Sequence, residues 1–356
     1  MPNNYGGFEQ FAEFLSLSLV KRGHQVTVYN SHNHPFRGQE WRGVRIIHCY
    51  DPEYKFGTIG QFIYDFNCIL DTRKRGFDII LQLGYTSSSI WGKLLPRKKS
   101  IVTTNMDGLE WKRSKFPKPI QRFLKYAERL AILNSDYLIS DSVGIQDYIK
   151  NKYHKESVYI PYGANVFKKP ERKVLDTYGL KRYQYNILIA RLEPENSIEI
   201  ILDGMVSSKI PTTFLVIGNH QTKYGNFLKT KYIQYSKIVF LGGIYDIKIL
   251  NNLRYYSNLY FHGHSVGGTN PSLLEAMGSG ALICAHDNIF NKAILNDDAF
   301  YFKSQRDILK IALEVNKKSH INLIKNNLYK IKNTYSWQLV NDQYLNHFET
   351  IIKNSD

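Results

Sequence analysis

Two successive series of short apolar segments, alternating with amphipathic ones, constrain the fold of this chain most strongly. In the first series, amphipathic segments at 59–73, 120–133 and 143–152 are expected helices. The expected strands are residues 25–29, 44–49, 77–81, 100–103, 136–140 and 157–160. Because parallel neighbours need a crossover connection, usually a helix, this alternation predicts an α/β domain with a parallel sheet.

The second series follows a Pro/Gly- and Lys-rich break at 161–173. Its expected helices are 197–206, 246–256, 271–277 and 304–316. Its expected strands are 186–190, 213–217, 237–241, 258–261, 281–285 and 299–302. A chain of 356 residues is long enough for two cores. We therefore expect domains at 1–164 and 165–334, and an amphipathic helix at 335–356 that closes the second core or crosses back to the first.

Composition narrows the setting in which the chain works. No apolar run approaches the roughly 18 residues of a membrane span, and no signal peptide opens the sequence, so we expect a cytoplasmic protein. Three scattered cysteines without metal-type spacing favour reduced thiols. The net charge of +16 favours an anionic partner, although an AT-rich genome would also enrich lysine.

A Gly-rich loop that leads into a helix, residues 262–280, is the candidate binding motif. Pro271 suits the first helical position and Asn270 the N-cap. A helix N-terminus beside Gly267 and Gly268 would seat a phosphate, and Glu275 could accept hydrogen bonds from two sugar hydroxyls. This pattern predicts a nucleotide site. The alternative is a strand–loop–helix corner whose glycines serve only the turn.

The N-terminus departs from this pattern. Residues 2–7 form a turn-rich loop before a helix with Phe8, Phe11 and Leu15 on one face. In a doubly wound domain a strand leads into such a loop, yet Met1 already lies inside it. We therefore expect the N-terminal sheet to lack its first strand, because the true start lies upstream or the gene product is truncated.

Four motifs in order carry a family resemblance. The stretch GGTNPSLLEAMGSGA resembles the donor-site signature of retaining GT-B glycosyltransferases of the family 4 type, and the loop 190–196, ARLEPEN, resembles their Arg-containing loop. The opening PNNYGGFEQFAE and the segment 105–113, NMDGLEWKR, are similar to a bacterial rhamnosyltransferase group, β-1,4-rhamnosyltransferases included, whose N-terminal domain is of the DUF1972 type. The resemblance implies two Rossmann-like α/β domains facing a cleft.

The resemblance also implies roles for individual residues. Arg191 would contact the donor diphosphate, and Glu275 would hold the nucleoside ribose. An N-terminal loop near the donor sugar and acceptor would comprise Tyr5, Gly6 and Gly7. The other expected donor-binding residues are Asn196, Gly267, Gly268, Thr269 and Asn270. The expected catalytic residues are Asp107, Glu110 and His264, with plain ion pairing as the alternative for the two carboxylates.

Two departures from the family pattern bear on the donor. Asn196 stands where the family has a lysine, and Gly267 stands where it has a glutamate. His262 and His264 lie just upstream, either as donor-site groups or as polar residues at a strand end. The first departure removes one positive charge from the diphosphate site, and the second fits a sugar with a different hydroxyl pattern, such as L-rhamnose.

The stretch 111–125 holds six basic residues, no acid and several aromatics. It could contact an anionic membrane face, bind a polyprenyl-pyrophosphate-linked acceptor, or form a solvated face. Nucleic-acid binding is not expected, because no recognised nucleic-acid module accompanies it. The six residues are Lys112, Arg113, Lys115, Lys118, Arg122 and Lys125.

The resemblance thus implies a retaining hexosyltransferase. We expect it to use no metal, since no Asp-x-Asp pair follows a strand, and no cofactor. Its expected donor is dTDP-L-rhamnose. Its expected acceptor is a lipid-linked saccharide of capsule or cell-surface polysaccharide synthesis, met at the inner face of the plasma membrane. Two alternatives stay open: a UDP- or GDP-sugar donor, and a non-catalytic nucleotide-sugar-binding relic.

Overall fold

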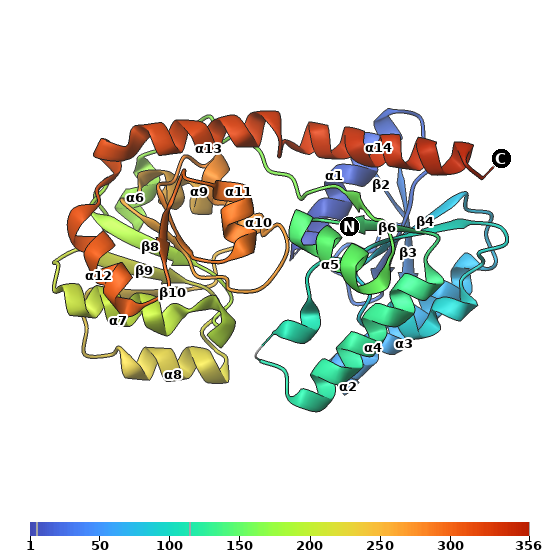
Figure 1. The fold of residues 1–356 in the computed structure, drawn as a ribbon, viewed down its shortest axis with the longest axis horizontal. Coiled ribbons are helices and arrows are strands. Elements are labelled where there is room, and N and C mark those ends of the chain that lie inside the picture. The colour runs from blue at the N-terminus through green and yellow to red at the C-terminus, as the bar shows by residue number, and fades with distance from the viewer. Residues whose placement is uncertain (5, 114, 356) are drawn as a thin grey trace. The chain divides into compact units, whose positions relative to one another are not determined.

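The computed structural model describes residues 1–4, 6–113 and 115–355. The chain divides into two compact units (Figure 1). The first comprises Met1–Lys112, Phe116–Tyr162 and Trp337–Asp356, and the second comprises Arg113–Lys115 and Gly163–Ser336. The predicted pair of α/β domains with parallel sheets is confirmed.

The first unit contains two sheets that do not pair with each other. One has the order β1-β3-β2, and the other is the parallel sheet β4-β5-β6-β7. The strands are β1 (Thr27–Ser31), β2 (Glu40–Trp41), β3 (Val44–Cys49), β4 (Ile79–Leu83), β5 (Ile101–Asn105), β6 (Tyr137–Ser140) and β7 (Val158–Tyr159). Both β1 and β4 are edge strands, and both line a cavity of about 1090 Å³ within this unit. None of the five β4 residues is fully buried for this reason, whereas four of the five in β5 are.

Helices cover the sheets of the first unit. They are α1 (Gly7–Lys21), α2 (Glu53–Phe56), α3 (Thr58–Thr72), α4 (Lys118–Asn134), α5 (Val143–Tyr153) and α14 (Trp337–Lys353), with short 3₁₀ turns η1 (Ser88–Leu94) and η2 (Glu110–Lys112). The C-terminal helix α14 packs against α1, and Trp337 stacks on Phe14 at a centroid distance of 4.4 Å. Phe11, Leu15 and Tyr344 are buried in the same cluster. The aromatics of the C-terminal helix therefore help to close the first core.

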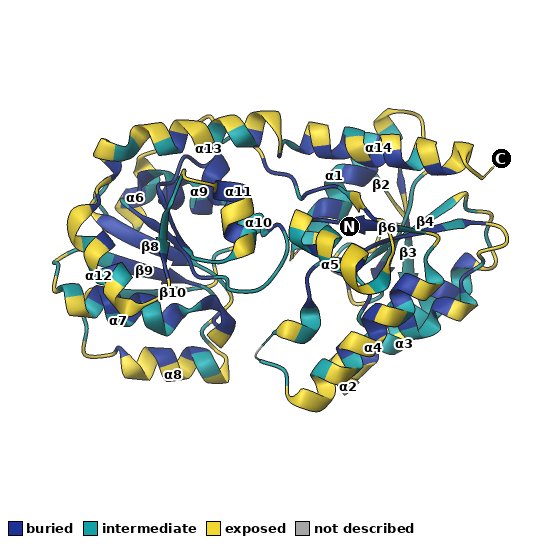
Figure 2. Cartoon of the chain, viewed as in Figure 1, coloured by how far each residue is buried: buried dark blue, intermediate teal, exposed yellow. Residues whose placement is uncertain are grey.

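The second unit is built on one parallel sheet of six strands, ordered β10-β9-β8-β11-β12-β13. The strands are β8 (Tyr185–Ile189), β9 (Thr213–Ile217), β10 (Ile238–Gly242), β11 (Tyr260–His262), β12 (Ile283–His286) and β13 (Phe300–Phe302). The central strands are almost wholly buried, as Figure 2 shows, because helices cover both faces. Buried parallel strands read as continuous apolar runs, which explains why the sequence revealed them.

Helices of the second unit fall into two packed groups. On one side α7 (Ile198–Ser208) packs against α12 (Gln305–Glu314); on the other α10 (Pro271–Gly278) contacts α9 (Ile247–Tyr256) and α13 (Ile321–Asn333) (Figure 1). The remaining elements are α6 (Lys173–Thr177), η3 (Pro194–Asn196), α8 (Lys223–Lys231), α11 (Ile289–Leu295) and η4 (Lys317–His320). In the part of the chain that the structure describes, no helix has the length and apolar character of a membrane span.

Candidate functional site

The loop between β11 and α10 forms the centre of the candidate site. As predicted, α10 begins at Pro271 with Asn270 as its N-cap. The Asn270 Oδ1 accepts hydrogen bonds from the backbone N–H of Ser272 at 2.9 Å and of Leu273 at 3.4 Å. These amides are therefore already engaged. An anion at this terminus would have to displace the Asn270 side chain or bind the preceding loop, Gly267 to Thr269.

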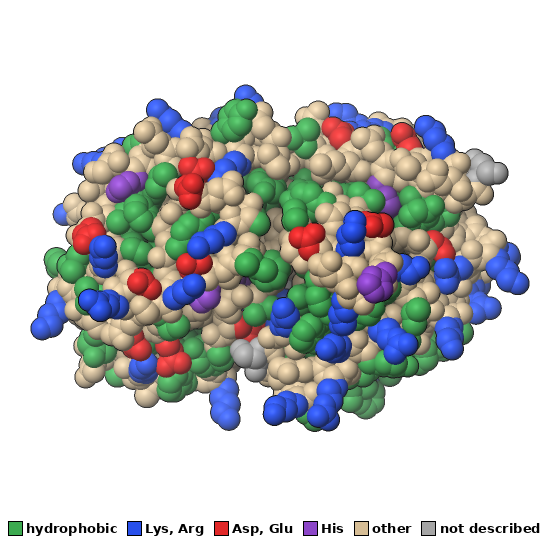
Figure 3. Space-filling view, viewed as in Figure 1, with side chains coloured by type: hydrophobic (Ala, Val, Ile, Leu, Met, Phe, Trp, Pro, Cys, Tyr) green, Lys and Arg blue, Asp and Glu red, His purple; other side chains and the backbone are tan. Residues whose placement is uncertain are grey.

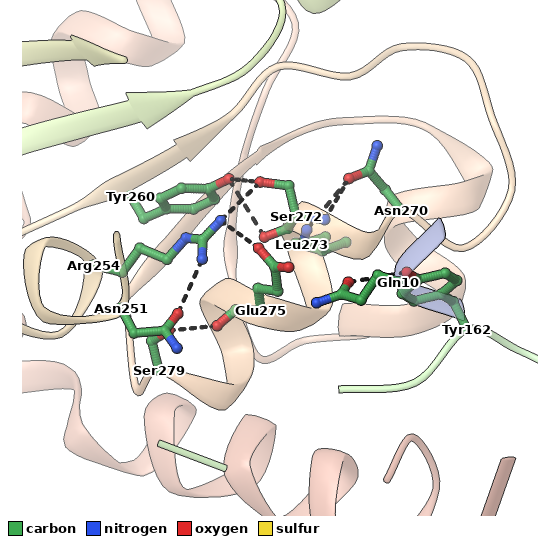
Figure 4. Close-up of polar contacts among 10 residues, drawn as sticks. All are labelled: Gln10, Tyr162, Asn251, Arg254, Tyr260, Asn270, Ser272, Leu273, Glu275 and Ser279. Carbon is green, nitrogen blue, oxygen red and sulfur yellow. Dashed lines mark hydrogen bonds and ion pairs between the residues drawn. The ribbon is translucent and has the colours of Figure 1, made fainter. Parts of the chain in front are cut away.

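Behind this helix start lies a buried ion pair that the sequence did not reveal. Arg254 on α9 is 1% exposed, and its Nη2 donates to Glu275 Oε2 at 2.8 Å and to Ser272 Oγ at 3.2 Å (Figure 4). Its Nη1 donates to Asn251 Oδ1 at 3.1 Å. The Glu275 side chain itself remains 21% exposed. A carboxylate is thus anchored on one side and open to solvent on the other.

The Arg191 loop, which follows β8, is hydrogen-bonded to the loop between β11 and α10. Arg191 is exposed, and its carbonyl oxygen accepts a hydrogen bond of 2.7 Å from the Nδ2 of buried Asn196. Asn196 therefore shapes this loop with its side chain. The backbone N–H and hydroxyl of Ser265 both donate to the Glu195 carbonyl, at 3.1 and 2.8 Å. Gly263 permits this approach, since a Cβ there would lie 1.9 Å from the Asn196 carbonyl oxygen.

His262 and His264 stack with their ring centroids 4.4 Å apart. Burial lowers the pKa of both, and the positive charge of Arg191 lowers the pKa of His264 further, to about 3. Both rings are therefore neutral at physiological pH, so each can donate from one nitrogen and accept at the other. Asn288 and Asn291 hold the His264 backbone by donating to its carbonyl oxygen at 2.9 and 3.1 Å.

Two carboxylates in the Arg191 loop pair with the basic stretch. Lys115 Nζ lies 3.1 Å from Glu193 Oε1, and Arg113 lies 3.9 Å from Glu195. Burial opposes ionisation of Glu193, but Lys115 and Arg191 outweigh it and lower its pKa. Burial and the hydrogen bond that the protonated Glu195 carboxyl donates to Glu193 raise the pKa of Glu195. This acidic pair was not predicted as a site.

The candidate residues of the first unit are also well anchored. Asp107 follows β5 with a φ of +47°, and its backbone N–H donates to Asn105 Oδ1 at 2.9 Å. Glu110 opens η2, and its N–H donates to the Gly108 carbonyl at 3.0 Å. Asn105 in turn donates to the Tyr344 hydroxyl of α14 at 2.9 Å. The loop that carries both carboxylates is therefore fixed to the core of its unit.

The N-terminal loop leads directly into α1. Gly6, with a φ of +112°, is the N-cap, and Gly7 is the first helical residue. The Tyr162 hydroxyl donates to the Gly7 carbonyl at 2.6 Å and to Gln10 Oε1 at 3.0 Å, the second of which Figure 4 shows. Tyr5, the third residue expected there, lies outside the described residues.

Four of the six basic residues in the stretch 111–125 belong to the first unit: Lys112, Lys118, Arg122 and Lys125. Trp111 donates from Nε1 to the buried Glu128 at 2.9 Å, and the Nζ atoms of Lys112 and Lys125 lie 5.5 and 4.8 Å from its ring centroid. Three exposed cations of the basic stretch lie on α4, and we call them the α4 cations: Lys118, Arg122 and Lys125. Lysine and arginine are more frequent than acidic side chains on the face in Figure 3.

Solved structures with this architecture are distant in sequence. Sucrose-phosphate synthase from Thermosynechococcus elongatus matches with a TM-score of 0.81 and 16% identity, over 98% of this chain and 94% of that one. HepE from Anabaena, solved with UDP and glucose, matches with a TM-score of 0.77 and 14% identity, over 98% and 97%. A glycosyltransferase from Rickettsia africae matches with a TM-score of 0.75 and 14% identity, over 98% and 96%. The fold is GT-B.

Comparison with protein families gives one match to part of this GT-B chain. Residues 89–165 match a family described as a domain of unknown function, DUF1972. This segment runs from η1 to just beyond β7 and includes Asp107, Glu110 and the basic stretch. No curated protein matches the chain.

Proposed function

We propose that this protein is a retaining glycosyltransferase that moves L-rhamnose from dTDP-L-rhamnose to a lipid-linked saccharide. The GT-B fold supports the reaction class, and one structural relative, HepE, was solved with UDP-glucose. The observation that carries the proposal is the anchored Glu275 carboxylate one turn into α10, in the helix that follows the Gly-rich loop and the neutral His pair. Sugar hydroxyls and a diphosphate are the chemistry that such groups recognise.

In this proposal the second unit holds the donor. Glu275 accepts a hydrogen bond from the nucleoside sugar, and the exposed Arg191 guanidinium binds the diphosphate, a role that needs no titration. Backbone donors of Gly267 to Thr269 complete the anion site. Because His264 is neutral, it offers a donor or an acceptor to the transferred sugar without adding charge.

The leaving diphosphate gains stabilisation from Arg191 and loop N–H groups, which act on charge that develops in the transition state. The first unit supplies the acceptor side through Asp107, Glu110 and the Gly6–Gly7 loop. In a retaining transfer the acceptor hydroxyl attacks on the face of the leaving group, and a phosphate oxygen takes its proton. The electron pair of the sugar–phosphate bond leaves with the diphosphate.

The lipid-linked acceptor places the reaction at the inner membrane face. The α4 cations are exposed and lie on one helix with the exposed apolar side chains of Ile120 and Tyr126. Each cation near an anionic surface contributes about 1 kcal/mol. Together with the net charge of +16, this surface supports a peripheral contact with anionic lipid or with the pyrophosphate of the acceptor.

The test is a thermal-shift and donor-hydrolysis screen with dTDP-rhamnose, UDP-glucose, UDP-GlcNAc and GDP-mannose. A ligand at 100 times its Kd stabilises the native state by about 2.7 kcal/mol, which such a screen resolves. We expect the largest shift and slow hydrolysis with dTDP-rhamnose. A larger response to another sugar nucleotide would overturn the donor assignment, and binding without any turnover or transfer would identify a non-catalytic binding protein.

A matched pair of variants ties the activity to the site. Glu275→Gln removes the charge from an acceptor, and hydrogen bonds to charged groups contribute about 1.5 to 3 kcal/mol, so we expect donor affinity to fall roughly 10- to 100-fold. Glu314→Gln changes an exposed glutamate at the end of α12 in the same unit and should leave affinity unchanged. Equal affinities of the two variants would contradict the site assignment.

A further inference from the structure

The contact between Arg254 and Glu275 is one-sided. Only Oε2 of the carboxylate meets the guanidinium, at 2.8 Å, while the Glu275 side chain keeps 21% of its surface exposed. The other oxygen, Oε1, is therefore the one free to face a ligand.

Further hydrogen bonds fix the Arg254 guanidinium, so that it cannot move when a ligand binds. Besides Glu275, it donates to Ser272 Oγ and Asn251 Oδ1, and it lies 5.9 Å from the Tyr260 ring centroid (Figure 4). The Tyr260 hydroxyl and Ser272 Oγ are 2.9 Å apart, which fixes the serine as well. With 1% of its surface exposed, Arg254 can contact the nucleoside only through Glu275.

We infer that Arg254 is a positioning residue that commits one oxygen of Glu275, so that the carboxylate contacts the donor nucleoside through a single hydroxyl, the 3′-OH. This inference rests on the proposed function and deepens it. A carboxylate that binds a ribose diol evenly uses one oxygen for each hydroxyl. Here Oε2 already accepts from Arg254, whereas Oε1 accepts from none of the described residues, which suits a 2′-deoxynucleoside diphosphate such as dTDP.

The inference predicts how much the 2′-OH and the 3′-OH of the nucleoside each contribute to donor affinity. A 2′-OH would have to share Oε2 with the Arg254 guanidinium, so we expect it to add little affinity. The 3′-OH donates to Oε1 and contributes a charge-assisted hydrogen bond. Specificity is a difference between two affinities, so nucleotides that differ in one hydroxyl measure it directly.

The test uses the wild-type protein and three thymine nucleotides in isothermal titration calorimetry. They are dTDP, its ribose counterpart 5-methyl-UDP, and 2′,3′-dideoxy-TDP. We expect the first two to bind within twofold of each other and the dideoxy compound to bind at least tenfold more weakly. Binding of 5-methyl-UDP tenfold tighter than dTDP, or equal binding of all three, would overturn the inference. If none of the three binds, the proposed function itself fails.

A pair of variants then tests Arg254 directly. Arg254→Met keeps most of the side-chain length but releases Oε2, so we expect weaker dTDP binding and at least a threefold shift toward 5-methyl-UDP. Arg254→Lys, which retains a cationic donor, should keep the wild-type ratio. Lys248→Met, an exposed position on the same helix, serves as the control. An unchanged ratio in folded Arg254→Met excludes a positioning role, and if that variant does not fold, the wild-type series decides alone.

Discussion

Lys317 provides the sharpest quantitative test of the second unit. It opens η4 and is 3% exposed, and its Nζ donates to the Tyr255 carbonyl at 2.5 Å. The ring centroids of Tyr183 and Tyr255 lie 5.4 and 5.5 Å from that nitrogen. Burial, and then the nearby charge of Arg182, lower the pKa of Lys317 from 10.5 to about 7.

The sign and size of the effect follow from proton linkage. Between pH 7 and pH 9 the unfolded lysine keeps its proton while the native one loses it, so the unfolded state binds more protons and stability rises with pH. The full slope is about 1.4 kcal/mol per pH unit, and half of it applies at pH 7, where native Lys317 is half protonated. We therefore expect Lys317 to add about 2 kcal/mol to the free energy of unfolding between pH 7 and pH 9.

The assay is urea unfolding of the wild type and of Lys317→Met at pH 7, 8 and 9. Methionine stays neutral, so the difference between the two proteins isolates the lysine from every other group that titrates. That difference should grow with pH by about 2 kcal/mol in favour of the wild type. Lys318→Met, an exposed neighbour, should follow the wild type throughout. A pH-independent difference between the wild type and Lys317→Met would refute the argument.

Two further predictions concern the binding surfaces. Gly263→Ala places a Cβ against the Asn196 carbonyl; we expect a loss of about 1 to 3 kcal/mol in urea unfolding and weaker dTDP binding in calorimetry, whereas Gly76→Ala, with open space around it, should change neither. Replacing the three α4 cations by alanine should weaken binding to anionic vesicles by about 3 kcal/mol in a sedimentation assay, without affecting neutral vesicles. The control for net charge is a triple lysine-to-alanine variant of the second unit at Lys310, Lys325 and Lys332. Equal losses of vesicle binding in the two variants would contradict a specific contact through α4.

The predictable part of the fold was local. Apart from β2, which was not predicted, strand positions in both units were predicted to within about two residues, because buried parallel strands are short apolar runs between turns. The start of α10 was also predicted from a local signal. Asn270 is a residue type that favours the N-cap, and Pro271 one that favours the first helical turn. Such signals need no knowledge of distant neighbours.

Elements with weaker local signals were missed. Helix α8 contains Gly225, which lowers its helix propensity, and has few apolar residues, so its amphipathic pattern is weak. Helix α13 does carry Ile324 and Ile331 at helical spacing on its buried face, and this signal could have been used. The separation of the first unit into two sheets depends on which strand edges meet, a long-range property that periodicity does not encode.

The candidate site was predicted from its exposed and loop residues, and Arg254 was not among them. In the sequence Arg254 is one cation in a lysine-rich chain, although its neighbours Leu250, Leu253 and Tyr256 mark that face of α9 as buried. An arginine on a buried helix face needs a carboxylate partner, because an unpaired buried charge is strongly unfavourable. A buried ion pair gives little net stability over an apolar pair of similar size. The contribution of Arg254 should therefore appear in the orientation of Glu275, and nucleotide selectivity measures it more directly than the free energy of unfolding does.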